Sequence, residues 1–140
     1  MIRHFTKVTI TSVQRPVMND VNADLQWFGQ SLGLFGERDK DKSCFRLFIE
    51  LLKALRKGEL LNSDELAERV GLSRGTVVHH MHKLMDSGIV VTRNGYYILR
   101  VDNLGTLIME MKKDMNRVFE DLTAMASELD HALGLENKEE

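Results

Sequence analysis

Residues 62–100 have the sequence NSDELAERVGLSRGTVVHHMHKLMDSGIVVTRNGYYILR. Asn62 and, three residues later, Glu65 have the side chains of a capping box, which predicts the start of a short helix. Gly71 can end that helix with a left-handed backbone, and Ser73 can accept a hydrogen bond from the first free amides of a second helix. The stretch therefore predicts two helices joined by a tight turn.

In the second helix, four side chains recur at the spacing of a single helix face, namely Val77, His80, Met81 and Leu84. We expect them to point into a core. If His80 packs there with one hydrogen-bond partner, His80→Asp should unfold the domain, because a buried charge without a counter-ion is costly. Two β-rich runs follow, residues 89–93 and 96–100, and Asn94-Gly95 between them is the dipeptide most typical of a two-residue hairpin. Helix, turn, helix and hairpin together predict a winged helix-turn-helix.

Residues 63–90, SDELAERVGLSRGTVVHHMHKLMDSGIV, resemble the DNA-reading region of bacterial and archaeal ArsR-like and MarR-like transcriptional regulators. The resemblance rests on one spaced set of side chains, Ser73, Thr76, Val77, His80, Met81 and Leu84. It implies a mainly α fold with a small β-wing (α+β). It also implies a sequence-specific regulator of transcription that binds double-stranded DNA.

Length and composition fit this interpretation. The chain has 140 residues, 43% of them hydrophobic and 29% charged, which suits one compact domain and an extra element. No apolar run approaches the roughly 20 residues that span a bilayer, so no membrane partner is expected. The first residues lack a signal-peptide pattern, and a single cysteine, Cys44, forms no internal disulfide, so we expect a cytoplasmic protein.

The net charge of −2 conceals an uneven distribution. Residues 1–100 contain 15 Lys and Arg against 11 Asp and Glu, whereas residues 101–140 contain 4 against 10. Basic charge accompanies the predicted DNA-reading region, and acidic charge accompanies the tail. The overall charge therefore does not argue against a nucleic-acid partner.

Residues 1–42 form an N-terminal extension in this prediction. Residues 1–13 are rich in β-branched side chains and suit a strand, which the only proline, Pro16, should end. Asn19 or Asp20 can cap a following helix. Its apolar face would consist of Val21, Leu25, Phe28 and Leu32.

Residues 43–101 form the predicted winged helix-turn-helix domain. A helix should begin at Ser43 and end at Gly58. Its apolar face is expected to consist of Phe45, Phe48, Ile49, Leu52 and Leu55. Leu60-Leu61 could add a short third strand to the wing sheet.

Residues 102–135 form a predicted coiled-coil dimerisation helix, followed by a frayed tail at residues 136–140. Asp102 or Asn103 can cap this helix, and 29 residues from 103 to 131 would span about 43 Å. Apolar side chains repeat every 3.5 residues, at Ile108, Met111, Met115, Val118, Leu122, Met125, Leu129 and Ala132. The alternative is that the helix folds back on the N-terminal helix of its own chain. We favour a homodimer that binds an inverted-repeat operator.

The resemblance implies DNA contacts on the outward face of the second helix and at the wing tip. The residues concerned are Ser73, Arg74, Gly75, Thr76, Val78, His79, His82, Lys83, Arg93 and Asn94. No acidic residue occurs from Ser73 through Met85, whereas an ordinary solvated face would mix both signs of charge. For the wing tip, contact and plain solvation remain equally open.

The sequence does not suggest an enzyme, a metal sensor or a cofactor. His79 and His82 should face outward and His80 inward, so the three do not converge on one ion. No nucleophile–base pair, paired carboxylates or phosphate loop is present. The remaining alternative is a winged helix used as a protein–protein module of the transcription or replication machinery. No motif identifies a small-molecule effector.

Overall fold

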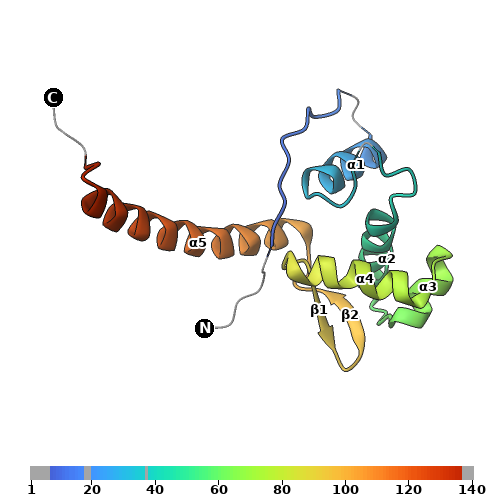
Figure 1. Cartoon of the computed structure of the whole chain (residues 1–140). Helices are drawn as coiled ribbons and strands as arrows, with labels where there is room; N and C mark the ends of the chain where they lie inside the picture. Colours follow the sequence, from blue (N-terminus) through green and yellow to red (C-terminus); the bar gives the residue numbers. More distant parts are fainter. Residues whose placement is uncertain (1–6, 18–19, 37, 137–140) are drawn as a thin grey trace. The chain divides into compact units, whose positions relative to one another are not determined.

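The computed structural model describes residues 7–17, 20–36 and 38–136. Along these ranges the elements are α1 (Val21–Ser31), α2 (Ser43–Lys57), α3 (Ser63–Val70), α4 (Arg74–Asp86), β1 (Val90–Arg93), β2 (Tyr96–Leu99) and α5 (Leu104–Leu133), shown in Figure 1. The chain divides after Asp102 into two units. We call the first unit the head, and the second consists of α5 and the residues after it.

The tight turn between α3 and α4 has the predicted caps. The amide of Glu65 donates to Asn62 Oδ1 at 2.9 Å, and the amide of Asn62 donates to Glu65 Oε1 at 3.0 Å, which completes the capping box. Gly71 ends α3 in the left-handed conformation, with φ of 71°. Ser73 Oγ accepts from the amide of Thr76 at 3.1 Å and begins α4. The predicted helix-turn-helix is confirmed.

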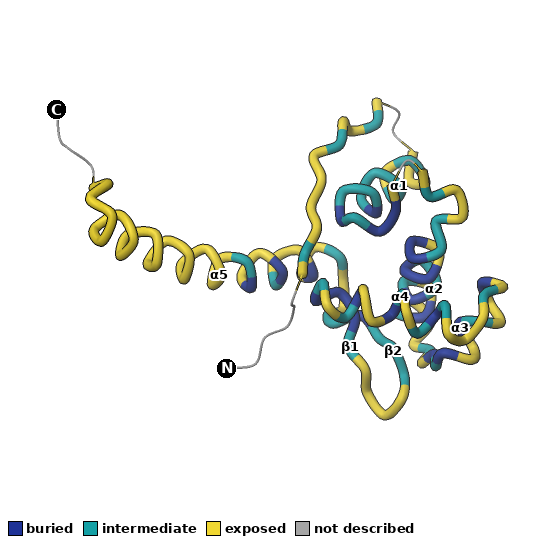
Figure 2. The backbone as a smooth tube through the Cα atoms, viewed as in Figure 1, coloured by how far each residue is buried: buried dark blue, intermediate teal, exposed yellow. Residues whose placement is uncertain are grey.

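The core of the head lies between α2, α3 and α4. Val77, Met81 and Leu84 of α4 are fully buried, as predicted, and they share the core with Phe48 and Leu66. Figure 2 shows this buried centre in dark blue. His80 on the same face is only half-buried, and its Nδ1 is buried without a hydrogen-bond partner in the described part of the chain. The hydrogen-bond partner considered for this histidine is therefore not found at Nδ1.

Helix α2 buries a different face from the predicted one. Its buried side chains are Cys44, Phe45, Leu47, Phe48, Leu51 and Ala54, whereas the predicted Ile49, Leu52 and Leu55 are half-buried. The helix packs against α3 and α4 and also against β2. Its buried face is therefore wider and turned relative to the stripe seen in the sequence.

The wing is the predicted hairpin. Val90 pairs with Leu99 and Arg93 with Tyr96 in antiparallel register. Asn94 and Gly95 have φ of 52° and 83°, the positive values that a type I′ turn requires. The expected third strand at Leu60-Leu61 is reduced to one bridge, in which Tyr97 N donates to Leu61 O at 2.9 Å.

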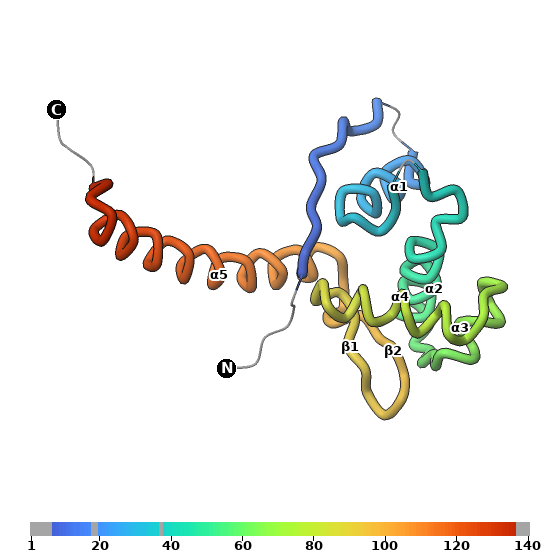
Figure 3. The backbone as a smooth tube through the Cα atoms, viewed as in Figure 1, coloured from blue at the N-terminus to red at the C-terminus, as the bar shows by residue number. Residues whose placement is uncertain are grey.

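The predicted N-terminal strand is absent from residues 7–13, and residues 1–6 lie outside the described part. Figure 3 shows residues 7–13 as an extended segment. Lys7 N donates to Asp86 O at 3.1 Å, and Thr11 N donates to Ser31 O at 2.8 Å. Both acceptors are carbonyls at the C-terminal ends of helices, so the segment meets helix ends, and among the described residues no strand pairs with it.

Helix α1 begins with a cap from Asp20, whose Oδ1 accepts from Asn22 N at 3.2 Å, while the alternative cap Asn19 lies outside the described residues. Gly29 allows α1 to approach Phe45 of α2 closely, because a Cβ there would lie 2.4 Å from the ring. The predicted apolar face holds only in part: Leu32 is buried, Leu25 and Phe28 are half-buried, and Val21 is exposed.

Helix α5 confirms the predicted long C-terminal helix. Asn103 Oδ1 accepts from Thr106 N at 2.8 Å at its start, and Gly134 with φ of 70° ends it. Most of its length, from Asn116 onward, is exposed (Figure 2). None of the helices in the described part of the chain combines the length and apolar content needed to cross a membrane.

Candidate nucleic-acid interface

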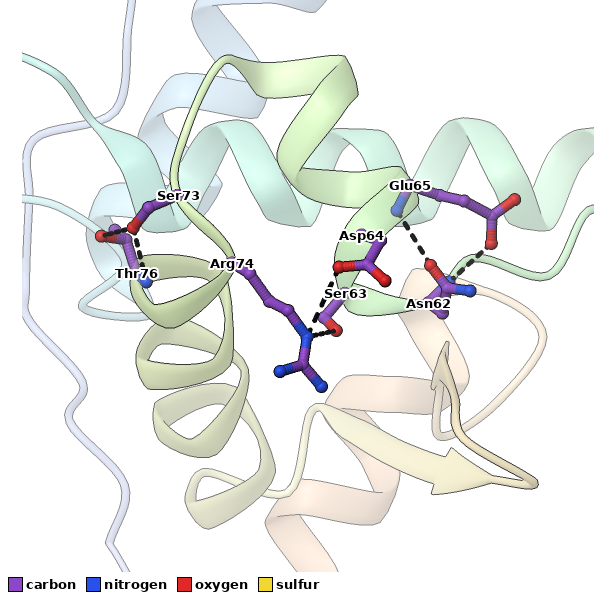
Figure 4. Close-up of polar contacts among 7 residues, drawn as sticks. All are labelled: Asn62, Ser63, Asp64, Glu65, Ser73, Arg74 and Thr76. Atoms are coloured by element: carbon purple, nitrogen blue, oxygen red, sulfur yellow. Dashed lines mark hydrogen bonds and ion pairs between the residues drawn. The ribbon is translucent and has the colours of Figure 1, made fainter.

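The N-terminal turn of α4 presents polar groups outward. The hydroxyl groups of Ser73 and Thr76 are 2.8 Å apart and hydrogen-bond to each other, beside the cap bond that Ser73 accepts (Figure 4). Amides at a helix N-terminus lack partners within the helix and suit a negatively charged group. This turn can therefore accept a phosphate.

Arg74 is held in place by the start of α3. Its Nε donates to Ser63 Oγ at 3.2 Å and lies 3.4 Å from Asp64 Oδ1 (Figure 4). The side chain remains 70% exposed. In the described residues no partner is assigned to its Nη1 or Nη2, so the outer end of the guanidinium keeps its donors available. Two adjacent N–H donors can bind the O6 and N7 atoms of guanine.

The outward face of α4 from Gly75 to Lys83 carries no acidic side chain, and Asp86 follows at the end of the helix. Gly75, His79, His82 and Lys83 are exposed, and Val78 is half-buried. A Cβ on Gly75 would meet nothing within 4 Å, so the packing of this chain does not require glycine there. A small residue at this position leaves room for a close approach from outside.

The wing tip adds a second outward group. Arg93 ends β1 and Asn94 is the first residue of the turn, and both are exposed. An exposed arginine on a hairpin tip can enter a narrow minor groove or contact phosphate. The head thus presents two basic elements, α4 and the wing.

Burial shifts the pKa values of two side chains in the head, His80 and Cys44. Burial lowers the pKa of His80, and the charges of His79 and Lys83 lower it further, so the neutral imidazole is favoured. Burial raises the pKa of the Cys44 thiol to about 11, which keeps it protonated and unreactive. In the ranges that the structure describes, no three His, Cys, Asp or Glu side chains come together to hold a metal ion.

The predicted dimerisation residues all lie on α5. Val118, Leu122, Met125 and Leu129 expose between 39% and 58% of their surface, and Ile108 exposes 37%. Met115 is half-buried, and Met111 is only 3% exposed. Apart from Ile108, the exposed large apolar side chains of the stripe therefore run from Val118 to Leu129.

Sequence reasoning missed two features of the site. Ser63 and Asp64 are 11 and 10 residues from Arg74, and no local pattern links them. Lys7 lies still further away, yet it lines a pocket with His79, His82 and Lys83. The only available signal was the tight turn at Gly71, which returns the chain and brings the starts of α3 and α4 together.

Comparison with known families agrees with this geometry. Residues 49–92 match the family described as bacterial regulatory protein, arsR family. No curated protein and no solved structure matches the chain. The matched region contains most of α2, all of α3 and α4, and most of β1. The chain therefore carries an ArsR-family helix-turn-helix domain, a DNA-binding domain of transcriptional regulators that are not enzymes. This match favours DNA binding over the protein–protein module.

Proposed function

We propose that this ArsR-family regulator recognises a specific double-stranded DNA sequence as a homodimer, with α4 in the major groove and the wing against the backbone or minor groove. Arg74 reads a base edge, Lys83 contacts phosphate, and Arg93 contacts the groove beside the wing. The hydroxyl groups and free amides at the start of α4 bind a second phosphate.

The observation that carries this proposal is the orientation of Arg74. Ser63 and Asp64 hold its Nε, while Nη1 and Nη2 point away from both (Figure 4). A side chain that is already oriented loses less conformational entropy when it binds. The guanidinium is therefore prepared for bidentate recognition, for which guanine offers two adjacent acceptors in the major groove.

The proposal of a homodimer rests on α5. Its 30 residues correspond to about 45 Å at 1.5 Å per residue. Val118, Leu122, Met125 and Leu129 alternate steps of four and three and remain exposed, an arrangement typical of a coiled-coil seam. A second copy covers such a stripe with an identical one. Two-fold symmetry then requires an inverted repeat, with half-sites one helical turn or a multiple of it apart, roughly 34 Å per turn.

Selection of bound sequences from random DNA tests the function directly. We expect an inverted repeat to be enriched. On that sequence, Arg74→Ala should lose about 1 to 3 kcal/mol of binding free energy and relax one base position, while Lys83→Ala should weaken selected and random DNA alike. Arg56→Ala removes an exposed arginine from α2 and serves as the charge-matched control. Equal losses on selected and random DNA for Arg74→Ala would contradict base recognition.

Asp64→Asn gives a sharper test of the arginine's orientation. It removes the carboxylate beside Arg74 but keeps the shape of the side chain. Removing a negative charge near DNA should slightly raise affinity for random sequences, while the looser arginine lowers the preference for the selected one. A parallel gain on both DNAs would mean that Asp64 does not orient Arg74.

A further inference from the structure

A pocket of about 560 Å³ lies in the head beside the C-terminal half of α4. One wall is the extended N-terminal segment, with Lys7 and Thr9. The opposite wall is α4, with His79, His82 and Lys83. The pocket is therefore formed by parts of the chain more than 60 residues apart, and no sequence motif indicates it.

The N-terminal segment that forms one wall of the pocket is held at three places. Lys7 N donates to Asp86 O at 3.1 Å, and Thr11 N donates to Ser31 O at 2.8 Å. Between these bonds Thr9 packs on Gly33, whose φ of 73° and lack of a side chain allow the close approach, because a Cβ there would lie 3.0 Å from Thr9 Cβ. The N-terminal segment is thus fixed against the end of α4 and the turn after α1.

The pocket is lined by hydrogen-bond donors that have no partner among the described residues. Lys7, His79, His82 and Lys83 line it, and in the part of the chain that the structure describes none of their side chains has an assigned hydrogen bond or ion pair. Asp86 is the one acidic side chain of the lining. Two lysine ammonium groups and one carboxylate line the pocket. This chemistry suits a negatively charged ligand that accepts several hydrogen bonds.

We propose that this pocket binds the oxyanion group, phosphate or carboxylate, of a small molecule, and that its occupation opposes DNA binding. His79, His82 and Lys83 belong to the outward face of α4 that is proposed to meet DNA. A bound anion would neutralise Lys83 and place negative charge where a DNA phosphate must approach. The second half of this inference rests on the proposed function, whereas the first half does not.

The first test uses the whole chain without DNA and inorganic phosphate as the probe. The chain has five histidines, so their imidazole ring proton resonances can be followed individually by NMR. During a phosphate titration at constant ionic strength, balanced with chloride, we expect saturable shifts at His79 and His82 and none at His131. Lys7→Gln should weaken this binding about tenfold, because one charged hydrogen bond is lost. Lys57→Gln removes an exposed lysine at the end of α2 and should leave it unchanged.

The second test separates a small-molecule anion from the phosphates of DNA. Phosphate should release bound DNA more effectively than chloride at equal ionic strength, and this difference should disappear in Lys7→Gln. If phosphate causes no saturable shift in the free protein while Lys7→Gln weakens DNA binding, the pocket is a contact for the DNA backbone and the proposal is overturned. Shifts that persist undiminished in Lys7→Gln overturn it as well. A failure to bind any specific DNA would leave the first test intact, so the two proposals can fail separately.

Discussion

The head and the distal half of α5 differ in how far their apolar side chains are buried. In the head Leu66 of α3 and Leu84 of α4 are fully buried, whereas Leu122 in α5 is 58% exposed. The N-termini of α3, α4 and α5 are all capped by a side chain, so the difference does not come from local helix formation. The head buries its apolar side chains within its own fold, whereas the distal half of α5 leaves its stripe uncovered. We therefore propose that a second copy of the chain covers the stripe of α5, whereas the head buries its apolar side chains without a partner.

The largest expected effect comes from charging the stripe. Val118→Glu with Leu122→Glu would place four like charges in a homodimeric seam, which is strongly unfavourable away from water. Light scattering should then report a monomer, and operator binding should be lost while the head keeps its unfolding midpoint. Asn116→Glu with Thr123→Glu adds the same charge at exposed positions off the stripe and should leave the dimer intact. A double variant that remains dimeric would remove the stripe from the interface.

Two leucine-to-alanine variants compare the core of the head with the exposed stripe of α5. Leu66→Ala should cost about 2 to 5 kcal/mol of unfolding free energy at every protein concentration, because it leaves a cavity in a closed core. Leu122→Ala should cost less, and only at concentrations where the dimer forms. Urea unfolding at several protein concentrations measures both. A concentration-independent loss in Leu122→Ala would show that its partner lies within the same chain.

The two asparagine caps allow a comparison at the level of a single hydrogen bond. Asn62→Ala should cost the head about 1 kcal/mol, because α3 has only eight residues and loses the hydrogen bond that the Glu65 amide donates to Asn62 Oδ1. Asn62→Asp keeps an acceptor and should restore most of this. Asn103→Ala should affect only the first turn of the 30-residue α5, seen as faster hydrogen exchange of the Thr106 amide. Equal effects of the two alanine variants on the head would mean that the two units unfold together.

The smallest expected effect depends on pH and is confined to the head. Burial lowers the pKa of His80 from its ordinary 6.5, so the unfolded chain binds a proton at a higher pH than the folded head does. Stability is therefore fully present above 6.5 and should fall as pH decreases toward the lower folded-state pKa. His80→Gln should flatten this dependence in urea titrations at a series of pH values, whereas His131→Gln in α5 should not. An unchanged slope in His80→Gln would assign the effect to another group.

The sequence predicted those features whose partners lie close together along the chain. The capping box needs Asn62 and Glu65, and the wing turn needs Asn94 and Gly95, so local rules were sufficient. The periodicity of α5 was equally visible. The predicted DNA contacts on α4 followed from the same helical spacing together with a family resemblance, and they remain predictions.

The missed features depend on distant partners. The N-terminal segment alternates like a strand, but it meets the ends of α1 and α4, and no β-propensity reveals that. The buried face of α2 is turned because β2 covers a second side of the helix. Ser63 and Asp64 reach Arg74 only because the turn at Gly71 folds α3 back on α4. In each case the structure depends on tertiary contacts between residues distant in sequence, which local sequence patterns do not reveal.

The single tryptophan gives the N-terminal segment an optical signal. Trp27 on α1 donates from Nε1 to Val13 O at 2.9 Å, and the guanidinium of Arg15 lies 5.6 Å from the centre of its ring. An indole in contact with both a backbone carbonyl and a cation changes its emission when either one leaves. Fluorescence of the unlabelled chain therefore reports whether residues 13–15 stay seated on α1, in real time and without any substitution.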